Sequence, residues 1–272
     1  MSELKLPAHI RNVFGQDPFA EMMQLQGRIY RNVSGRRTIK VELAGGSYFI
    51  KQHFGVGWGE IFKNLLSFKK PILGAMTEVH AIEKLEQLGI ATTPLVAYGQ
   101  RGSNPANLQS FVLTQDLGDI ISLEDLCADW KLHPPEPKFK NELMTAIAKL
   151  TARLHGAGLC HRDFYLCHLV MKKSELAEGK INLILIDLHR MLTDQPIGGS
   201  AAMKDIAGLY FSAIDCGFNA QDWALFRQYY LPHSDAFWNQ VVQRADKLYK
   251  KFYSQKFQQR LANERANLEA DR

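Results

Sequence analysis

The densest group of potentially reactive side chains lies in the segment LHGAGLCHRDFYLCHLV, residues 154–170. Its His-Arg-Asp sequence at 161–163 has the order of a kinase catalytic loop, in which a carboxylate orients an acceptor hydroxyl. The same segment contains Cys-His pairs at 160–161 and 167–168, with the thiol and imidazole groups that zinc prefers. The segment is therefore compatible with phosphoryl transfer or with structural metal binding.

The spacing of the two Cys-His pairs argues against zinc. The pattern C-H-x5-C-H matches no common zinc motif, because adjacent residues in an extended loop point to opposite sides. Arg162 would lie within the same loop, and its positive charge disfavours a nearby cation. A third interpretation treats Cys160 and Cys167 as small buried hydrophobic residues beside a helix end. That interpretation leaves the His-Arg-Asp sequence unexplained.

The companions of a kinase catalytic loop occur in the expected order along the chain. Asp163 is the candidate for orienting the hydroxyl, and Asp187, at the end of the apolar segment LILID, is a candidate ligand for Mg²⁺. Lys51 in SYFIKQH is the candidate for pairing with ATP phosphates, and Glu78 on a following helix could anchor it. Asp205, predicted at the head of a later helix, could support the loop from behind. Each residue also fits an ordinary structural role, but all of them in this order favour a kinase.

Two features depart from the protein-kinase pattern. His168 stands five residues after Asp163, where an Asn that holds a second magnesium ion is expected. Because Mg²⁺ prefers oxygen ligands, His168 either binds metal less well or contacts phosphate or the loop backbone. No glycine-rich loop precedes the lysine; the turn RNVSGRRT takes its place, and Arg36 and Arg37 are candidate phosphate ligands. An exposed basic hairpin tip is the competing interpretation.

Local patterns predict the elements that position the upstream residues. The segments GRIYRNV, RTIKVEL and SYFIKQH predict a three-stranded antiparallel meander over residues 28–53. The segments PLVAYGQ and SFVLTQDL are predicted to complete a five-stranded sheet. Amphipathic spacing predicts one helix over residues 58–70 and a second in MTEVHAIEKLEQLG, which ends at Gly89.

The chain changes character after Asp119, where helical patterns dominate. Ser122 and Asp125 resemble a capping box, and KFKNELMTAIAKLTARLHGAG carries an apolar stripe that ends at glycine. Further helices are predicted from about residue 203 to the C-terminus. We therefore predict an α+β fold with a small β-rich N-lobe, residues 1–118, and a larger mainly α-helical C-lobe, residues 119–272.

Composition narrows the functional classes. With 46% apolar and 22% charged residues, the 272-residue chain has the composition of a globular protein. Its net charge of +5 and pI of about 8.9 are compatible with an anionic cofactor, an anionic lipid surface or nucleic acid, or with a solvated basic face. Four cysteines without a CxxC pair and an N-terminal segment without an apolar signal region predict a cytoplasmic location.

Longer motifs identify a family. DPF, LQG, RRT, SYFIK, EIFKNLLSFKKPILGA, SLEDLCADW, HRDFYLCHLV, IDLHR and KDIAGLYFSA together resemble the bacterial lipopolysaccharide core heptose(I) kinases, from about residue 10 to the final helices. The resemblance implies a eukaryotic-protein-kinase-like two-lobed fold, and transfer of the γ-phosphoryl group of ATP, with Mg²⁺, to position 4 of the first inner-core heptose. The implied partners are ATP and the lipopolysaccharide core acceptor, with no nucleic acid; no protein partner is identified.

The same resemblance implies roles for individual residues. Asp163 would be the catalytic base, the Lys51–Glu78 pair would anchor phosphate in the N-lobe, and Asp187 would bind the metal. The family also carries a histidine at the position of His168, so this departure does not argue against activity. Phe164 stands where family members have cysteine. The resemblance places the adenine-facing hinge at Thr114–Leu117, with Gln115 and Leu117 as its contact residues.

A lipid-anchored acceptor predicts peripheral contact with the anionic inner membrane. Helix 58–70 is one candidate surface, and the C-terminal stretch from Val241 is another, with eight Lys/Arg against four Asp/Glu, a net charge of +4. The competing prediction for helix 58–70 is packing of Phe54, Trp58 and Phe62 in the core. For the C-terminal stretch it is a solvated capping helix.

Two other functions stay open at the level of sequence. One is a kinase of the same fold that acts on another core sugar or on a soluble small molecule. The other is an ATP-binding pseudokinase that serves as a scaffold, although the presence of Lys51, Glu78, Asp163 and Asp187 favours an active enzyme.

Overall fold

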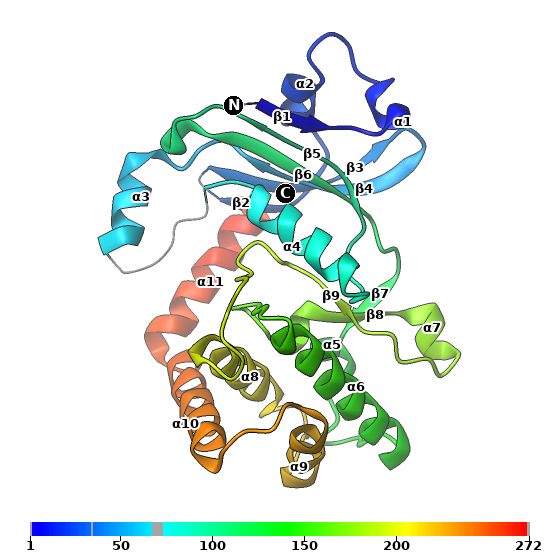
Figure 1. The fold of residues 1–272 in the computed structure, drawn as a ribbon, viewed down its shortest axis with the longest axis vertical. Coiled ribbons are helices and arrows are strands. Elements are labelled where there is room, and N and C mark those ends of the chain that lie inside the picture. The colour runs from blue at the N-terminus through cyan, green and yellow to red at the C-terminus, as the bar shows by residue number, and fades with distance from the viewer. Residues whose placement is uncertain (1, 34, 67–72, 271–272) are drawn as a thin grey trace. The chain divides into compact units, whose positions relative to one another are not determined.

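The computed structural model describes residues 2–33, 35–66 and 73–270, which form two compact units (Figure 1). The first unit comprises the described residues of 1–85, 93–116 and 264–272, and the second comprises 86–92 and 117–263. The predicted lobe boundary after residue 118 is close to the division after Asp116. The grouping of 86–92 and of the C-terminal segment differs from the predicted ranges, because tertiary contacts rather than local composition assign these segments.

The first unit is built on an antiparallel sheet, and the predicted meander forms one half of it (Figure 1). Residues 44–45 turn β3 back onto β4; Ala44 and Gly45 have positive φ values of 49° and 77°, as such tight hairpin turns require. The strands are β1 (Ser2–Lys5), β2 (Arg28–Val33), β3 (Arg36–Leu43), β4 (Gly46–His53), β5 (Leu95–Arg101) and β6 (Gln109–Gln115), in the order β1-β5-β6-β4-β3-β2.

This sheet has six strands, so the predicted number of five was wrong. The additional strand is β1, which pairs antiparallel with β5, so that Ser2 lies opposite Arg101 and Lys5 opposite Tyr98. Four residues give too short an alternation to indicate a strand. Their partner lies almost a hundred residues further along the chain, and no local pattern reports such a pairing.

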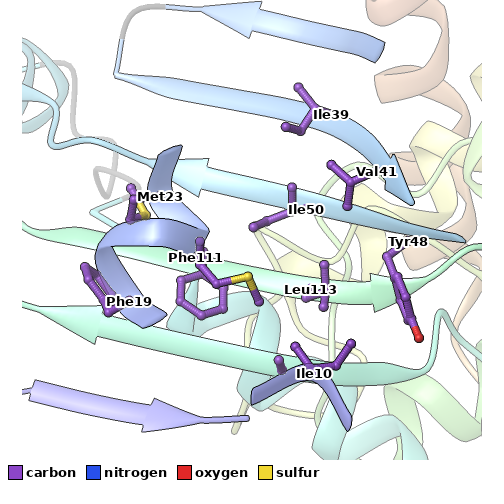
Figure 2. Packing of buried hydrophobic residues seen from close by; sticks show 11 residues of the cluster. Ile10, Phe19, Met23, Ile39, Val41, Tyr48, Ile50, Phe111 and Leu113 are labelled. Atoms are coloured by element: carbon purple, nitrogen blue, oxygen red, sulfur yellow. The ribbon is translucent and has the colours of Figure 1, made fainter. Parts of the chain in front are cut away.

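One face of this sheet is covered by two short N-terminal helices, α1 (Ala8–Arg11) and α2 (Pro18–Gln24). Asp17 caps α2 by accepting a hydrogen bond from the Ala20 N–H, and Pro18 occupies the first turn. Figure 2 shows the side chains of Phe19 and Met23 packed beside those of the strands. The buried cluster consists of Ile10, Phe19, Met22, Met23, Ile39, Val41, Tyr48, Ile50, Ala97, Phe111 and Leu113.

The opposite face of the sheet carries α4 (Met76–Gln87), because Glu78 on this helix reaches Lys51 on β4. Its apolar positions Val79, Ile82 and Leu85 are fully buried. The predicted helix 58–70 is present as α3 (Gly57–Leu66), which contacts the short helix η1 (Pro105–Asn107). Residues 67–70 of that prediction, including Lys69 and Lys70, lie outside the described residues.

The second unit is mainly helical. Its helices are α5 (Leu123–Leu126), α6 (Pro137–Gly156), α7 (Lys173–Ala177), α8 (Ser200–Ala213), α9 (Ala220–Tyr229), α10 (Asp235–Phe252) and α11 (Gln255–Ala270), of which α11 continues into the first unit. A three-stranded sheet orders β7 (Ile120–Ser122), β8 (Leu169–Lys172) and β9 (Ile184–Leu185), with η2 (Leu166–His168) preceding β8. Within the apolar segment LILID that ends at Asp187, strand β9 comprises two residues, Ile184 and Leu185.

Helix α6 is the long amphipathic helix predicted before the catalytic loop. Its apolar residues Leu143, Ile147 and Leu154 are buried, and it packs against α9, while α8 packs against α10. Lys140 on α6 and Asp222 on α9 form a nearly buried ion pair with an N–O distance of 2.6 Å. In the part of the chain that the structure describes, no helix is both long and apolar enough to cross a membrane.

Candidate active site

The predicted catalytic loop begins where α6 ends. Gly158, with φ of +70°, turns the chain, and Cys160 then exchanges two backbone hydrogen bonds with Leu192, of 3.0 and 2.8 Å. His161 is fully buried and its Nε2 donates to the Ile186 carbonyl over 2.9 Å. Burial lowers the pKa of His161, because the charged imidazolium would lose its hydration. His161 is therefore a neutral residue that joins the loop to the segment before Asp187.

Asp205 supports the loop as predicted, although its position in the helix differs. Helix α8 begins at Ser200, so Asp205 lies in its second turn and not at its head. Its carboxylate accepts the backbone N–H groups of His161 over 2.5 Å and of Arg162 over 2.7 Å. Arg162 has a φ of +72°, an unfavourable conformation for a side-chain-bearing residue, which these two charge-assisted hydrogen bonds help to hold.

Asp163 projects from this supported loop with its side chain 17% exposed. Arg190 Nη1 donates to both of its carboxylate oxygens, at 2.7 and 3.0 Å. Sequence reasoning did not assign a role to Arg190, although it lies in the quoted motif IDLHR, three residues after Asp187. The available signal was a basic residue three positions after the Asp predicted to bind metal.

His168 and Asp187 lie beside each other in the second unit. His168 Nδ1 is 2.6 Å from the Asp163 carbonyl oxygen, so this nitrogen carries the hydrogen. In the neutral ring, Nε2 then holds a lone pair, and it lies 3.8 Å from Asp187 Oδ2. His168 thus has one nitrogen that fixes the loop and a second that can bind a cation together with the carboxylate, as the predicted metal role requires.

A second histidine, His189, was missed by the sequence reasoning. Its Nδ1 donates to Asp187 Oδ1 over 2.6 Å, and its side chain is only 9% exposed. Asp187 itself has a φ of +62°, so the residue is held in a sparsely populated conformation. Carboxylates that bind metal ions are usually oriented by a hydrogen bond of this kind, so His189 is suited to orient Asp187.

In the first unit, Lys51 and Glu78 form the predicted ion pair. Lys51 Nζ is 2.7 Å from Glu78 Oε1; the lysine side chain is 22% exposed and the glutamate side chain 4% exposed. Lys51 lies opposite Thr38 on β3 and Val112 on β6, in the middle of three strands. The pair therefore fixes an ammonium group on the sheet face beside α4, where it is positioned to bind phosphate oxygens.

The two candidate arginines of the β2–β3 hairpin lie on opposite faces of the sheet, because neighbouring residues of a strand alternate. Arg37 faces α2: its guanidinium donates to Gln52 Oε1, to Gln26 Oε1 and to the Leu25 carbonyl, at 2.9, 3.1 and 2.9 Å. The geometry does not favour the predicted phosphate role of Arg37, since its three nitrogens already have partners. We therefore leave it out of the proposed phosphate site.

Arg36 lies on the same face as Thr38 and hence as Lys51. It also lines an open cavity of about 340 Å³ in the first unit, together with Asn32, Val33, Gly35 and Phe54. Arg36 therefore lies on the strand face that a phosphate contact needs.

The predicted hinge begins at the end of β6. Gln115 is exposed, and its backbone N–H donates to the Pro94 carbonyl over 2.9 Å. Asp116 accepts from Ser47 Oγ and forms a 2.6 Å ion pair with Lys40, which fastens this strand end to β3 and β4. Leu117 is the first residue after this point and belongs to the second unit.

The geometry does not support the zinc interpretation of the four cysteine and histidine residues. Both histidines use a ring nitrogen on a carbonyl oxygen, and burial raises the pKa of Cys160 and of Cys167 to about 12, which disfavours the thiolate. A different trio, His155, Cys160 and Asp205, has its polar atoms within 4.8 Å of one another. Its His155 already bonds Tyr230 and Asp205, so this trio is a structural network.

The second unit thus presents an aspartate on a supported loop, next to an aspartate–histidine pair suited to a divalent cation. The first unit presents a lysine–glutamate pair. These are the parts of a phosphotransferase with a protein-kinase-like fold.

Comparisons with known proteins agree with this class. The model of the lipopolysaccharide kinase (Kdo/WaaP) family matches residues 20–230. The chain is 43% identical over 217 residues to the lipopolysaccharide core heptose(I) kinase WaaP of Pseudomonas aeruginosa, covering 79% of this chain and 81% of that protein. It is 40% identical over 218 residues to the WaaP kinase of Escherichia coli K12, covering 79% and 82%.

Among solved structures, WaaP in complex with acyl carrier protein is similar, with a TM-score of 0.77 and 35% identity, covering 91% of this chain and 99% of that chain. The protein belongs to the lipopolysaccharide kinase (Kdo/WaaP) family.

Proposed function

We propose that the protein transfers the γ-phosphoryl group of ATP to the hydroxyl at position 4 of the first heptose of the lipopolysaccharide inner core. The observation that carries this proposal is the group formed by Asp163, His168 and Asp187 on one supported loop system, in a chain at least 40% identical to heptose(I) kinases. The lipid-linked acceptor places the reaction at the cytoplasmic face of the inner membrane.

The nucleotide contacts come from the groups of the first unit and from the hinge. The ammonium group of Lys51, held by Glu78, pairs with the α- and β-phosphates. Arg36 adds a second positive charge on the same sheet face. The backbone of the hinge, from Gln115 to Leu117, binds adenine.

Asp187 and His168 are the residues that would hold the divalent cation, which we take to be Mg²⁺. The donor set fits a cation, because the His168 tautomer leaves Nε2 as an acceptor 3.8 Å from the Asp187 carboxylate. When bound, the cation neutralises charge on the β- and γ-phosphate oxygens. His189 keeps the Asp187 carboxylate oriented toward this position.

Asp163 orients the acceptor hydroxyl and takes its proton as the oxygen attacks phosphorus. The loop that carries Asp163 is fixed by Asp205 and His161, so little reorganisation of the base is needed during transfer.

Membrane contact is assigned to α3. Trp58, Phe62 and Leu66 recur every four residues along this helix and are 51%, 56% and 82% exposed, whereas Ile61 is buried. An exposed apolar stripe on a basic protein suits a helix lying in an anionic lipid interface.

The decisive experiment is a transfer assay with purified protein, ATP and a panel of core oligosaccharides that differ in heptose phosphorylation. We expect product only with acceptors whose first heptose has a free hydroxyl at position 4. Asp163→Asn should lower turnover by about 1,000-fold or more, because it removes the proton acceptor, and should bind ATP as the wild type does.

Transfer to an acceptor already phosphorylated at that position, or to a soluble metabolite, would redirect the proposal to another kinase of the same fold. Near-normal turnover by Asp163→Asn would refute the assignment of the base. Normal ATP binding without transfer to any acceptor would favour the scaffold alternative.

A further inference from the structure

Within the part of the chain that the structure describes, Arg190 is the one side chain that donates hydrogen bonds to the carboxylate of Asp163, the proposed base. Its Nη1 lies 2.7 Å from Asp163 Oδ1 and 3.0 Å from Oδ2, so a single nitrogen bridges both oxygens. The two side chains are 35% and 17% exposed, which leaves the pair accessible to a ligand. A charge-assisted contact to both oxygens restrains the rotation of the carboxylate.

The backbone around Arg190 is anchored to the segment that leads into the catalytic loop. A turn joins the Met191 N–H to the Leu188 carbonyl over 3.0 Å, and both residues are buried. Directly after this turn, Leu192 exchanges its two hydrogen bonds with Cys160. Arg190 and Asp163 are therefore held in a common framework, although 27 residues separate them.

The loop itself supplies no such cation after the base. The residues between Asp163 and His168 are Phe, Tyr, Leu and Cys. Arg162 lies close enough to interact electrostatically with Asp163, but it donates its backbone N–H to Asp205. Arg190 is thus the guanidinium that acts directly on the Asp163 carboxylate.

The hydrogen bonds of Arg190 distinguish it from a purely structural arginine. Among the described residues, Arg190 donates hydrogen bonds only through Nη1 and only to Asp163, in contrast to Arg37, which uses all three of its nitrogens on other partners.

We infer that Arg190 is a positioning residue for phosphoryl transfer: its Nη1 aims the Asp163 carboxylate at the acceptor hydroxyl. This inference rests on the proposed function. In the step it serves, the acceptor oxygen forms a bond to the γ-phosphorus and the bond from phosphorus to the bridging oxygen of ADP breaks. The hydroxyl proton passes to Asp163, and ADP departs with the electron pair of the broken bond.

The first test measures kcat and KM of Arg190 variants. We expect Arg190→Ala to lower kcat by about 100-fold. The KM for ATP and the KM for the acceptor should change little, because the contact between Arg190 and Asp163 matters mainly in the transition state. Arg190→Lys should recover roughly 10-fold of the loss, since it restores the charge without the planar fork. Guanidinium ion added to Arg190→Ala should also restore turnover. Arg227→Ala, which removes an exposed arginine from α9, is the matched control and should keep normal turnover.

The second test is a double-mutant cycle with Asp163→Asn. If Arg190 acts through Asp163, the double variant should be within about threefold of Asp163→Asn alone, whereas independent effects would multiply. Multiplying effects, or an Arg190→Ala variant as active as the wild type or more active, would overturn the inference. So would a failure of both lysine and guanidinium to restore turnover in variants that melt at the wild-type temperature.

If Arg190→Ala does not fold, Arg190→Lys and Arg190→Gln carry the same comparison, and Lys must exceed Gln in turnover. The wild-type assay run in parallel separates this inference from the proposed function. Absence of transfer by the wild type overturns the proposed function, whereas equal transfer by the wild type and Arg190→Ala overturns only the role of Arg190.

Discussion

The two ring nitrogens of His168 have different neighbours: Nδ1 donates a hydrogen bond to the Asp163 carbonyl, and Nε2 lies beside the Asp187 carboxylate. An asparagine could perform both, because its amide N–H₂ would donate to the carbonyl and its oxygen would replace Nε2 as a ligand. We therefore expect His168→Asn to keep turnover within about tenfold of the wild type, and His168→Ala to lose roughly 100-fold or more.

The dependence on the divalent ion provides a second measurement for the same variants. An oxygen ligand suits Mg²⁺ better than imidazole does, so His168→Asn should raise the turnover with Mg²⁺ relative to the turnover with Mn²⁺, compared with the same ratio in the wild type. Equal losses in His168→Asn and His168→Ala would show instead that the imidazole itself is required.

At the scale of the element, Arg36 and Arg37 lie on opposite faces of β3, and we expect them to have different roles. Arg37→Ala should lower the free energy of unfolding by about 1–3 kcal/mol, because the buried Gln52 would lose a hydrogen-bond donor to its Oε1. Its KM for ATP should stay near the wild-type value. Arg36→Ala should raise the KM for ATP by about tenfold and change stability less, because it removes the proposed phosphate contact.

Thermal melting and ATP-dependent kinetics of the two variants decide between these roles. The pair is matched, since both changes remove one arginine from adjacent positions of the same strand. A raised KM in Arg37→Ala with an unchanged melting temperature would return Arg37 to the phosphate site.

At the scale of the whole molecule, a net charge of +5 and the exposed stripe on α3 predict peripheral binding to anionic membrane. Trp58→Ser and Phe62→Ser should each weaken partitioning of the full chain onto phosphatidylglycerol vesicles by about 10-fold or more, since each loses roughly 1.5–3 kcal/mol of apolar burial in the interface. Vesicle sedimentation at low and high salt separates the contribution of charge from the contribution of apolar burial.

Leu132→Ser is the matched control for this experiment, because Leu132 is 79% exposed and lies in the second unit. It should partition as the wild type does. Equal loss in all three variants, or no loss in the α3 variants, would contradict the assignment of this helix to the membrane.

The sequence was enough to predict the order of the candidate site residues along the chain and the type of element that carries each. These residues are Lys51, Glu78, Asp163 and Asp187. The reason is that strand alternation, helical periodicity and glycine turns are local, and each of these residues lies at a fixed place in such a pattern. The meander of β2, β3 and β4 and the helices α4 and α6 were predicted correctly for the same reason. The family was also apparent, because its motifs are contiguous segments.

Tertiary structure decided which side chains meet. Arg36 and Arg37 are equivalent in a sequence pattern, yet a shift of one residue in register exchanges the sheet faces, and only the pairing with β4 fixes that register. The pairing of β1 with β5 and the contact of Arg190 with Asp163 join residues distant in sequence. The sequence by itself therefore determined the chemistry available to this protein, whereas only the folded chain decided which arginine acts on the base, because such contacts arise from long-range packing that no local pattern records.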